Sequence, residues 1–389
     1  MTTADLRDRA RRADYGVVST ALSRCSDREL RELVEAAVPV GAGIGGQTLR
    51  MEVDGVPVFV KQVRLTDLER QPENVGSTAN LFGLPMSCHL GVGSIGSSGF
   101  GAWRELAVHA LTTVWVLAGD HDSFPLTYHW RVLTDSGRPL PDELADVDRA
   151  VAYWGGGGAV RRRIEALRES TASLTLFLEY LPQTLHDWFG QQVAAGGADA
   201  EQACAMVERE LEAGVAFLGS HGLLHLDAHF ENILTDGDRL YFADYGLAVS
   251  SGFDLAPDEV GFVDRFRGYD RAYAATCLVN WLVVELFGYG PDRRRAFVDD
   301  CAAGELPYGV PPGVAAVLRR HAAVAAETGS FFRRFRHESR ATPYPAEAKC
   351  DSFDDDLSSG ADADRPVAAV ERYTPRYDDD HDQGAGRGA

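Results

Sequence analysis

An aspartate and an asparagine lie five residues apart in a short segment near the middle of the chain. The segment, residues 225–232, reads H-L-D-A-H-F-E-N and contains Asp227 and Asn232. Twelve residues after Asn232 comes D-Y-G, which begins at Asp244. An Asp-Gly pair at 236–237 predicts a hairpin that returns Asp244 beside Asn232. Oxygen ligands from two such motifs suit Mg²⁺, and a neighbouring carboxylate can orient an attacking hydroxyl, so these residues indicate phosphoryl transfer.

A glycine-rich stretch and a lysine precede this segment. Gly41, Gly43 and Gly46 satisfy G-x-G-x-x-G, a pattern in which the backbone can close over phosphates, although a plain glycine turn between strands would look the same. Fifteen residues after Gly46, V-F-V-K places Lys61 at the end of an apolar strand, which suits a lysine that grips phosphates. A dinucleotide-binding fingerprint would need the glycines to open a helix instead. Glu105 is the candidate partner of Lys61, and an ordinary surface glutamate is the alternative.

Hydrophobic periodicity predicts the elements that must position these residues. Residues 1–37 are expected to be helical, with a capping box at Ser26 and Glu29. Three strands are expected in 38–63, followed by an irregular insertion at 64–101. The other expected elements are a helix from Ala102 to about Val116, strands at 126–134 and 173–181, helices at 184–193 and 200–219, strands at 233–235 and 240–243, and helices to about 338.

A strand-rich half followed by a helix-rich half predicts an α+β protein of two lobes, whose cleft is a natural ligand site. We expect a helical N-terminal extension at 1–37 and a β-rich N-lobe at 38–178, which includes the insertion at 64–101. A helical C-lobe is expected at 179–338, and an acidic, disordered tail at 339–389.

Taken together, the motifs resemble the protein-kinase-like superfamily, which includes Ser/Thr protein kinases and aminoglycoside or choline phosphotransferases. The resemblance covers roughly residues 38–335 and rests on the glycine pattern, V-F-V-K, H-x-D-x-x-x-x-N and D-Y-G. It implies a bilobal protein-kinase-like fold with a β-rich N-lobe and a helical C-lobe. It also implies ATP and Mg²⁺ as cofactors and a hydroxyl-bearing acceptor.

The resemblance assigns roles to the individual residues of these motifs. Asp227 would be the catalytic base, while Asn232 and Asp244 would bind Mg²⁺. Lys61 would contact the α and β phosphates and pair with Glu105. The nucleotide-covering loop would be formed by Gly41, Gly43 and Gly46, and the hinge backbone that receives adenine would be that of Glu179 and Leu181.

Two more residues are expected to support the catalytic segment rather than to react. By the same resemblance, His225 would brace this segment. Asp270, which opens the apolar helix 270–288, would anchor it. A helix N-cap explains Asp270 equally well.

Departures from the family pattern bear on the acceptor. Leu226 replaces the arginine of protein kinases that are switched by a phosphorylated loop, and His229 resembles the small-molecule phosphotransferases. The segment from 246 to 270 contains no A-P-E motif, which also weakens a protein acceptor. The Glu231-Asn232 ending, the hinge sequence and D-Y-G resemble protein kinases instead. We favour a protein Ser/Thr acceptor, with a small-molecule alcohol and a nucleotide-binding pseudokinase scaffold as alternatives.

Composition and charge set the remaining expectations. The formal net charge is −20, and a polyanion is repelled by nucleic acid and anionic membranes, so neither is an expected partner. The six scattered cysteines and an N-terminus without an apolar signal region favour the cytoplasm. The basic run 161–163 is expected to be a solvated face rather than an anion site. The sequence names neither the acceptor nor the oligomeric state.

Overall fold

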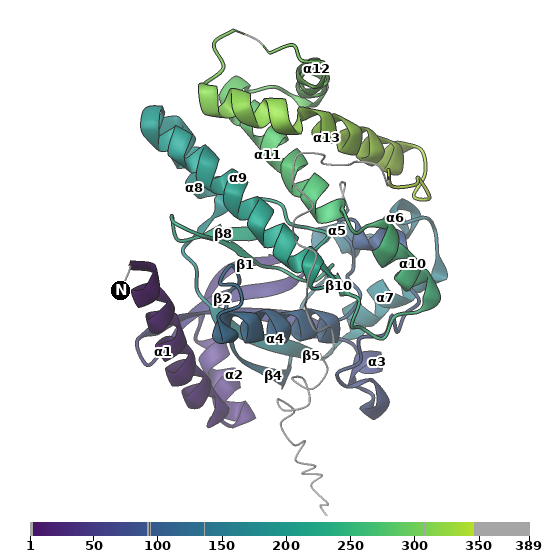
Figure 1. Cartoon of the computed structure of the whole chain (residues 1–389). Helices are drawn as coiled ribbons and strands as arrows, with labels where there is room; N and C mark the ends of the chain where they lie inside the picture. Colours follow the sequence, from purple (N-terminus) through teal and green to yellow (C-terminus); the bar gives the residue numbers. More distant parts are fainter. Residues whose placement is uncertain (1–2, 92, 94, 136, 307, 346–389) are drawn as a thin grey trace, which may run out of the picture.

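The computed structural model describes residues 3–91, 93, 95–135, 137–306 and 308–345. Strands and the N-terminal helices fill the lower half of Figure 1, and long helices fill the upper half. The fold is mixed α+β with an antiparallel five-stranded sheet and many helices, consistent with the predicted bilobal kinase-like arrangement. Most of the tail that was expected to be disordered lies outside the described residues.

The sheet runs in the order β1-β2-β3-β5-β4, and every neighbouring pair is antiparallel. Asp54 and Gly55 join β2 to β3 with φ angles of 49° and 81°, the left-handed conformation that an Asp-Gly hairpin turn requires. Because β5 lies between β3 and β4, it is buried along its whole length. The strands are β1 (Val38–Gly43), β2 (Gly46–Val53), β3 (Val56–Leu65), β4 (Thr127–Thr134) and β5 (Ala172–Glu179).

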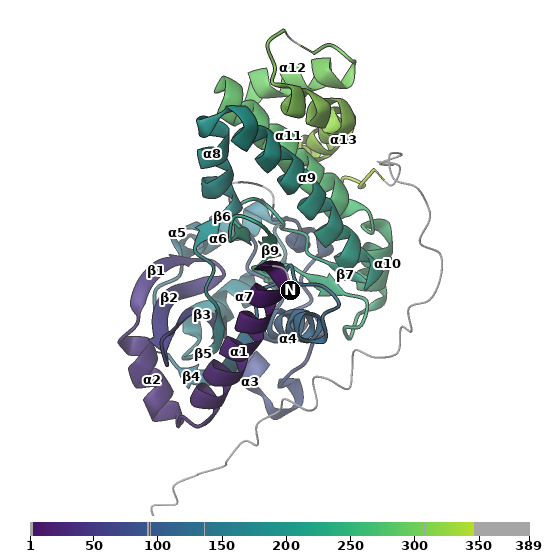
Figure 2. The same cartoon turned by 60° about the vertical axis from the view of Figure 1, so that its left-hand side comes forward.

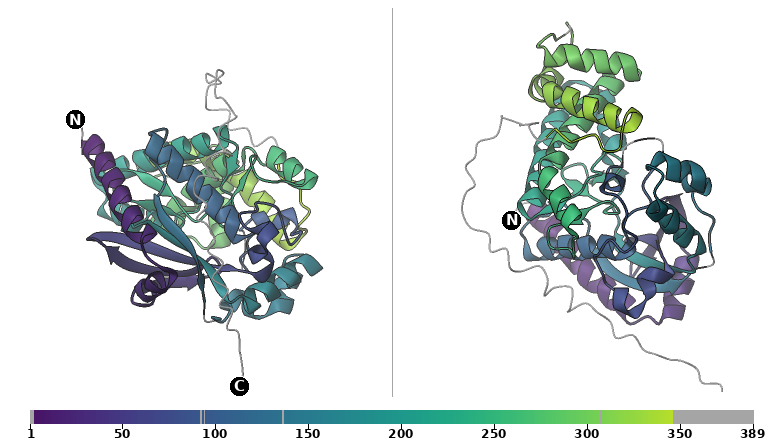
Figure 3. Two further views of the ribbon diagram at one scale, coloured as in Figure 1. Left: turned by 90° about the horizontal axis from the view of Figure 1, so that it is seen from below. Right: turned by 90° about the vertical axis from the view of Figure 1, so that its right-hand side faces the viewer.

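Helices cover the sheet on the N-lobe side. They are α1 (Thr3–Ser23), α2 (Asp27–Glu35) and α4 (Ala102–Ala118). The predicted capping box of Ser26 and Glu29 opens α2. Both α1 and α4 contact β4, and Figures 2 and 3 show them crossing the sheet. Val18 of α1, Trp115 of α4 and Tyr128 of β4 belong to one hydrophobic core.

The C-lobe consists of long helices and short strands. The helices are α8 (Leu185–Ala195), α9 (Gly197–Ser220), α10 (Pro257–Arg265), α11 (Tyr269–Phe287), α12 (Pro291–Ala302) and α13 (Pro312–His337). The strands are β6 (Gln183–Thr184), β7 (Leu223–Leu224), β8 (Ile233–Thr235), β9 (Leu240–Phe242) and β10 (Val249–Ser250). β8 and β9 form the hairpin that the sequence predicts, with Ile233 opposite Phe242.

The hydrophobicity of the helices bears on membrane crossing. Across the described ranges, no single helix has the length and apolar character needed to span a membrane. α11 and α12 pass that test only as a pair, and they are bent by 115° at the break between them.

Two insertions pack against the C-lobe. The first, 64–101, contains the short elements α3 (Asp67–Arg70), η1 (Pro72–Asn74) and η2 (Met86–His89). The second lies between β4 and β5 and forms helices that the sequence pattern did not predict, α5 (Asp142–Ala145), α6 (Val147–Tyr153) and α7 (Gly158–Glu169). Phe100, Trp154, Leu226 and Phe331 share one hydrophobic cluster, so both insertions contact the segment 225–232 and α13 through a common core.

The expectation of a solvated basic face at 161–163 is wrong for Arg163. Its side chain is 3% exposed and donates to Oε2 of Glu69, which is itself buried, at 2.8 Å. Arg161 is exposed as expected and pairs with Asp148. A buried ion pair between the two insertions therefore accounts for the third arginine of the run.

Candidate active site

Residues 225–232 form the loop between β7 and β8, and hydrogen bonds hold its predicted residues together. Asn232 donates from Nδ2 to the backbone oxygen of Asp227 at 3.0 Å and to its Oδ2 at 3.2 Å. The hairpin then brings Asp244 back to the loop, because Ala243 donates its backbone N–H to the carbonyl of Asn232 at 2.9 Å. Two motifs that are twelve residues apart therefore meet at one place.

The loop and the D-Y-G segment contain backbone conformations that residues other than glycine rarely adopt. Leu226 and Asp244 have φ angles of 66° and 60°, and a non-glycine residue in the left-handed region costs about 1–3 kcal/mol. Asp270 offsets this cost at the start of the loop, because its carboxylate accepts hydrogen bonds from the backbone N–H groups of His225 at 2.6 Å and Leu226 at 2.8 Å. The N-cap of α11 is Gly268. Asp270 is thus an anchor for the loop rather than a helix cap.

The imidazole ring of His225 is neutral and contacts backbone groups of Asp227 and Ala243. Its Nε2 lies 3.0 Å from the carbonyl oxygen of Ala243, and its Nδ1 lies 3.4 Å from the backbone nitrogen of Asp227. The backbone N–H of Asp227 can only donate, so Nδ1 accepts and Nε2 carries the proton. Burial lowers the pKa of His225 to about 4, which keeps the ring neutral at pH 7.

Lys61 joins β3 to α4 and to the D-Y-G segment. Its Nζ lies 2.7 Å from Oε1 of Glu105 and 2.8 Å from Oδ1 of Asp244. The side chains of Lys61 and Glu105 are 6% and 3% exposed, so this is not the surface glutamate of the alternative interpretation. Burial alone would lower the pKa of Lys61, but the charges of the two carboxylates outweigh it and raise the pKa. The ammonium therefore stays charged.

The glycine-rich turn between β1 and β2 lies over this ion pair. A Cβ atom at Gly45 would stand 3.3 Å from Nζ of Lys61 and 3.6 Å from Oδ2 of Asp244. Gly46 has a φ of 126°, and a Cβ there would overlap the carbonyl oxygen of Gln62. Gly41 and Gly43 lie farther back, at the end of β1. Among the glycines of this turn, Gly45 therefore lies closest to the ion pair of Lys61 and Asp244. The G-x-G-x-x-G pattern alone does not distinguish Gly45 from the others.

The predicted hinge begins at the last residue of β5. The backbone N–H of Glu179 donates to the carbonyl of Leu126 at 2.8 Å, so this N–H is not available to a ligand. Leu181 follows two residues later, between β5 and β6. The carboxylate of Glu179 is turned towards α1, where it meets Arg11. Adenine binding by this backbone remains a prediction.

The insertion contributes a residue that the sequence did not indicate. A Cβ at Gly91 would lie 2.7 Å from Oδ1 of Asp227 and 3.0 Å from Cδ1 of Leu247, so the backbone of the insertion touches the carboxylate. Oδ1 is buried and has no hydrogen-bond partner among the described residues, in contrast to Oδ2. An isolated glycine in an irregular stretch gives no sequence signal for such a contact.

The charges of the site fit a divalent cation. The carboxyl groups of Glu105, Asp227 and Asp244 outnumber the single ammonium of Lys61 in the site. Asn232 donates from its amide nitrogen, which leaves its amide oxygen as the side-chain acceptor. Asp244 is 42% exposed, as an ion ligand must be. Such a pair of oxygens suits Mg²⁺, which takes its other ligands from water and phosphate. Within the described ranges no group of three or more His, Cys, Asp or Glu could hold a metal.

The two aspartates have opposite pKa shifts. Burial, followed by the negative charge of Asp244, raises the pKa of Asp227 well above its usual value. Burial would also raise the pKa of Asp244, but the charge and the hydrogen bond of Lys61 lower it to about 2. Asp244 is therefore ionised across the physiological range, and Asp227 holds a proton more readily than Asp244 does.

A second ion pair holds α4 in place. Arg104 and Glu259 are 2% and 1% exposed and approach to 2.7 Å, which connects α4 to α10. Arg104 also donates from Nε to the carbonyl of Thr78 at 2.7 Å. Glu259 escaped the sequence prediction, although Pro257 at the first turn and a glutamate at the third position are signs of a helix start. Arg104 directly precedes Glu105 in α4, so its ion pair with Glu259 helps to position Glu105.

Comparison with known proteins gives a partial likeness. No family model matches this chain. A curated protein from Cytospora mali, mitogen-activated protein kinase kinase kinase mkh1, is 26% identical over 156 residues. That match spans 38% of this chain and 8% of the relative, so the chain covers only a small part of the relative's length. Together with the two-lobed α+β fold, the likeness indicates a relationship to protein-kinase-like proteins.

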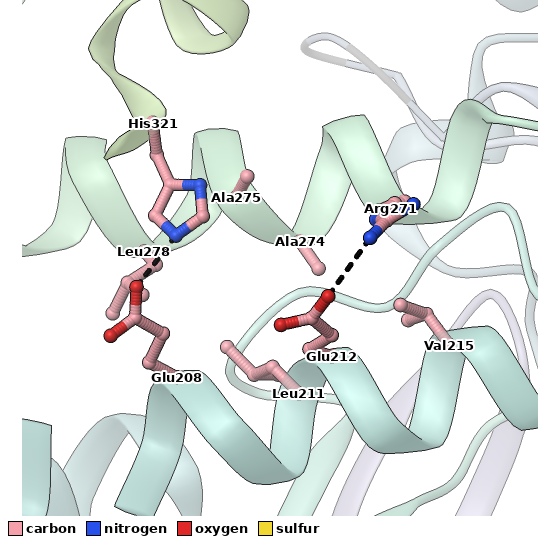
Figure 4. A pocket seen from close by; sticks show the side chains of 9 residues that line it. All are labelled: Glu208, Leu211, Glu212, Val215, Arg271, Ala274, Ala275, Leu278 and His321. Carbon is pink, nitrogen blue, oxygen red and sulfur yellow. Dashed lines mark hydrogen bonds and ion pairs between the residues drawn. The ribbon is translucent and has the colours of Figure 1, made fainter. Parts of the chain in front are cut away.

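A cavity outside this site lies between α9, α11 and α13. Figure 4 shows its charged residues paired across the helices, with His321 2.7 Å from Glu208 and Arg271 2.9 Å from Glu212. Burial alone would raise the pKa of Glu208, but hydrogen bonds from His321 and Arg320 lower it to about 2. None of the predicted site residues lines this cavity. Its ion pairs connect the helices of the C-lobe.

Proposed function

We propose that this chain is an ATP-dependent kinase that transfers the γ-phosphoryl group to a hydroxyl. The observation that carries the proposal is the meeting of Lys61 with Glu105 and Asp244, next to the loop of Asp227 and Asn232. Phosphoryl transfer depends on positioning and on charge stabilisation, and these groups would supply both. The partial likeness to a protein kinase kinase kinase supports the same class of reaction.

The residues would divide the work as follows. Bound ATP would supply the phosphoryl group, and Mg²⁺ would neutralise charge on its phosphates. Asn232 and Asp244 would hold the ion, and Lys61 would hold the α and β phosphates. Asp227 would orient the acceptor hydroxyl and accept its proton. The glycine turn would cover the phosphates and exclude water.

For the acceptor, we favour a protein Ser/Thr side chain. The hinge sequence, the Glu231-Asn232 ending and D-Y-G support this choice, as does the partial likeness to a mitogen-activated protein kinase kinase kinase. A pseudokinase scaffold is the weaker alternative, because a scaffold needs neither the ion pair of Lys61 nor the hydrogen-bonded pair of Asp227 and Asn232.

A small-molecule alcohol is the second candidate acceptor, and one contact favours it. The backbone at Gly91 lies against Oδ1 of Asp227, so the approach to this oxygen is narrow. A Gly91→Val variant would test the point. If a small alcohol passes beside Gly91, the variant loses transfer and keeps its affinity for Mg-ADP.

Transfer from γ-labelled Mg-ATP is the experiment that tests the function. Wild type and Asp227→Asn are compared without acceptor, with a generic protein acceptor, and with a panel of aminoglycosides and amino alcohols. Label on protein that disappears in the variant would support a protein kinase. Label only on a small molecule would support the second candidate. Binding of Mg-ATP without any transfer would support the pseudokinase and contradict the proposed reaction.

A further inference from the structure

The first turns of α1 carry charged contacts to the β8–β9 hairpin. Arg7 donates to Asp236 at 2.9 Å and to Asp238 at 2.5 Å. Asp8 accepts from Arg239 at 2.9 Å. Asn232 and Asp244, the two candidate metal ligands, lie at the open end of this hairpin, opposite the turn. The N-terminal helix is therefore attached to the C-lobe at the turn of the hairpin that carries these residues.

One turn farther along α1, Arg11 is buried against the start of the hinge. Its side chain is 7% exposed, and its Nε and Nη2 each lie 2.7 Å from an oxygen of the Glu179 carboxylate. Nη2 also donates to the carbonyl of Phe124 at 2.7 Å, and Nη1 to that of Asp122 at 3.2 Å. The guanidinium lies 5.0 Å from the ring centre of Tyr241 in β9. A single side chain thus binds the hinge, the loop before β4 and the hairpin.

Glu179 is held on both its backbone and its side chain. Its carboxylate also accepts the N–H of Leu126 at 3.0 Å, in addition to the backbone bond between the two residues. The far end of α1 is attached to the N-lobe, where Ser19 donates to the carbonyl of Tyr128. Figure 2 shows α1 running from the hairpin to the sheet. The helix therefore spans both lobes at the side of the hinge.

We propose that Arg11 is a positioning residue of the adenine site, through which α1 holds the hinge backbone in its binding position. The inference rests on the proposed function. Hydrogen bonds to a base depend on distances within a few tenths of an ångström, so the strand end that makes them must be held rigidly. The planar fork of arginine binds both oxygens of Glu179 at once, which a lysine cannot do. Arg11 would thus favour ligands that carry the base over ligands that carry only phosphates.

Calorimetric titration with two probes tests this inference. Mg-ADP contains the base, and Mg-tripolyphosphate lacks it. For Arg11→Ala we expect affinity for Mg-ADP to fall about tenfold or more and affinity for Mg-tripolyphosphate to change less than about twofold. Arg28→Ala is the matched control, because Arg28 pairs with Glu32 on exposed α2 and should change neither affinity.

The outcomes separate the inference from the function on which it rests. A wild type that does not bind Mg-ADP would overturn the proposed function. A wild type that binds Mg-ADP, with Arg11→Ala weakening both probes equally or neither, would overturn the role of Arg11. If Arg11→Ala does not fold, Arg11→Lys keeps the charge and removes the fork. That variant should lose about threefold for Mg-ADP alone, and unchanged affinity for Mg-ADP would contradict the proposal.

Discussion

The two oxygens of the Asp227 carboxylate have different surroundings. Oδ2 accepts a hydrogen bond from Asn232, whereas Oδ1 is buried beneath Gly91 and has no hydrogen-bond partner within the described part of the chain. Asn232 therefore orients the carboxylate through Oδ2, and the backbone at Gly91 packs against its other oxygen.

The raised pKa of Asp227 predicts the acid side of the pH–rate profile. The ionised form accepts the proton, so activity is present above the folded-state pKa and is lost as the pH falls through it. We expect the acid limb of kcat/KM at a pH well above 3.8, the ordinary value for an aspartate. Initial rates measured across a pH series would check this, and a limb at or below the ordinary value would contradict it.

Replacing the anchor of the catalytic loop should remove activity and stability together. Asp270→Ala leaves the buried N–H groups of His225 and Leu226 without acceptors, at about 1–3 kcal/mol each. Thermal unfolding would report the loss, and kcat would fall because Leu226 no longer keeps its left-handed backbone. Asp264→Ala, which removes an exposed ion pair with Arg267, should change neither quantity.

Local spacing explains which site residues could be predicted. Asp227, Asn232 and Asp244 lie within one loop and one hairpin, so their sequence positions alone bring them together. Gly91 and Arg11 reach the site from distant segments through packing that leaves no periodic pattern. A single sequence gives no pattern for contacts between individual residues that are distant along the chain.

At the scale of elements, α4 depends on a buried ion pair with α10. Removing one partner leaves an uncompensated charge, which costs about 3–5 kcal/mol. Glu259→Gln should therefore lower the free energy of unfolding by that amount. It should also lower kcat, since Arg104 directly precedes Glu105 in α4. Chemical denaturation would measure the first effect. The exposed neighbour Asp258, changed to Asn, is the control and should stay within about 0.5 kcal/mol of wild type.

The elements themselves were predictable where a pattern was regular. The three strands of 38–63 and the β8–β9 hairpin are confirmed, because a glycine-rich turn ends β1 and Asp-Gly turns end β2 and β8. Helices α5 and α6 were missed because they are short. Helix α7 was missed although Val160, Ile164 and Leu167 recur at helical spacing, because the arginines at 161–163 were interpreted as part of a polar segment. Arg163 shows why: its burial depends on Glu69, which is almost a hundred residues earlier.

At the scale of the whole molecule, buried neutral histidines should make the protein sensitive to acid. Burial lowers the pKa of His89 and His109 to about 3 and that of His225 to about 4. Their contribution to stability is complete above the unfolded value of 6.5 and is lost as the pH falls towards 3 or 4. Asp270, with its pKa raised by burial to about 6, has the opposite sign, because its contribution is lost as the pH rises through that value.

Replacing one of these histidines, His109, should reveal its contribution to the pH dependence of stability. His109 is buried against Tyr245, and neither ring nitrogen has a hydrogen-bond partner among the residues that the structure describes. Relative to His109→Gln, wild type should lose about 1.4 kcal/mol per pH unit below pH 6.5. Urea unfolding of both proteins at a series of pH values would measure the difference. A parallel dependence in the two proteins would contradict the prediction. The exposed His337, changed to Gln, should leave the pH dependence of wild type unchanged.

The attachment of α1 has a consequence for biosynthesis. Arg7 and its partner Asp236 are separated by 229 positions, so α1 is synthesised well before the hairpin to which it binds. At about 5–20 residues per second, the wait is roughly 10–50 seconds. During this interval the apolar face of α1, with Val18 and Leu22, lacks part of its final surroundings. A nascent chain stalled before the hairpin would therefore display α1 to chaperones and proteases, and a chain that includes the hairpin would not.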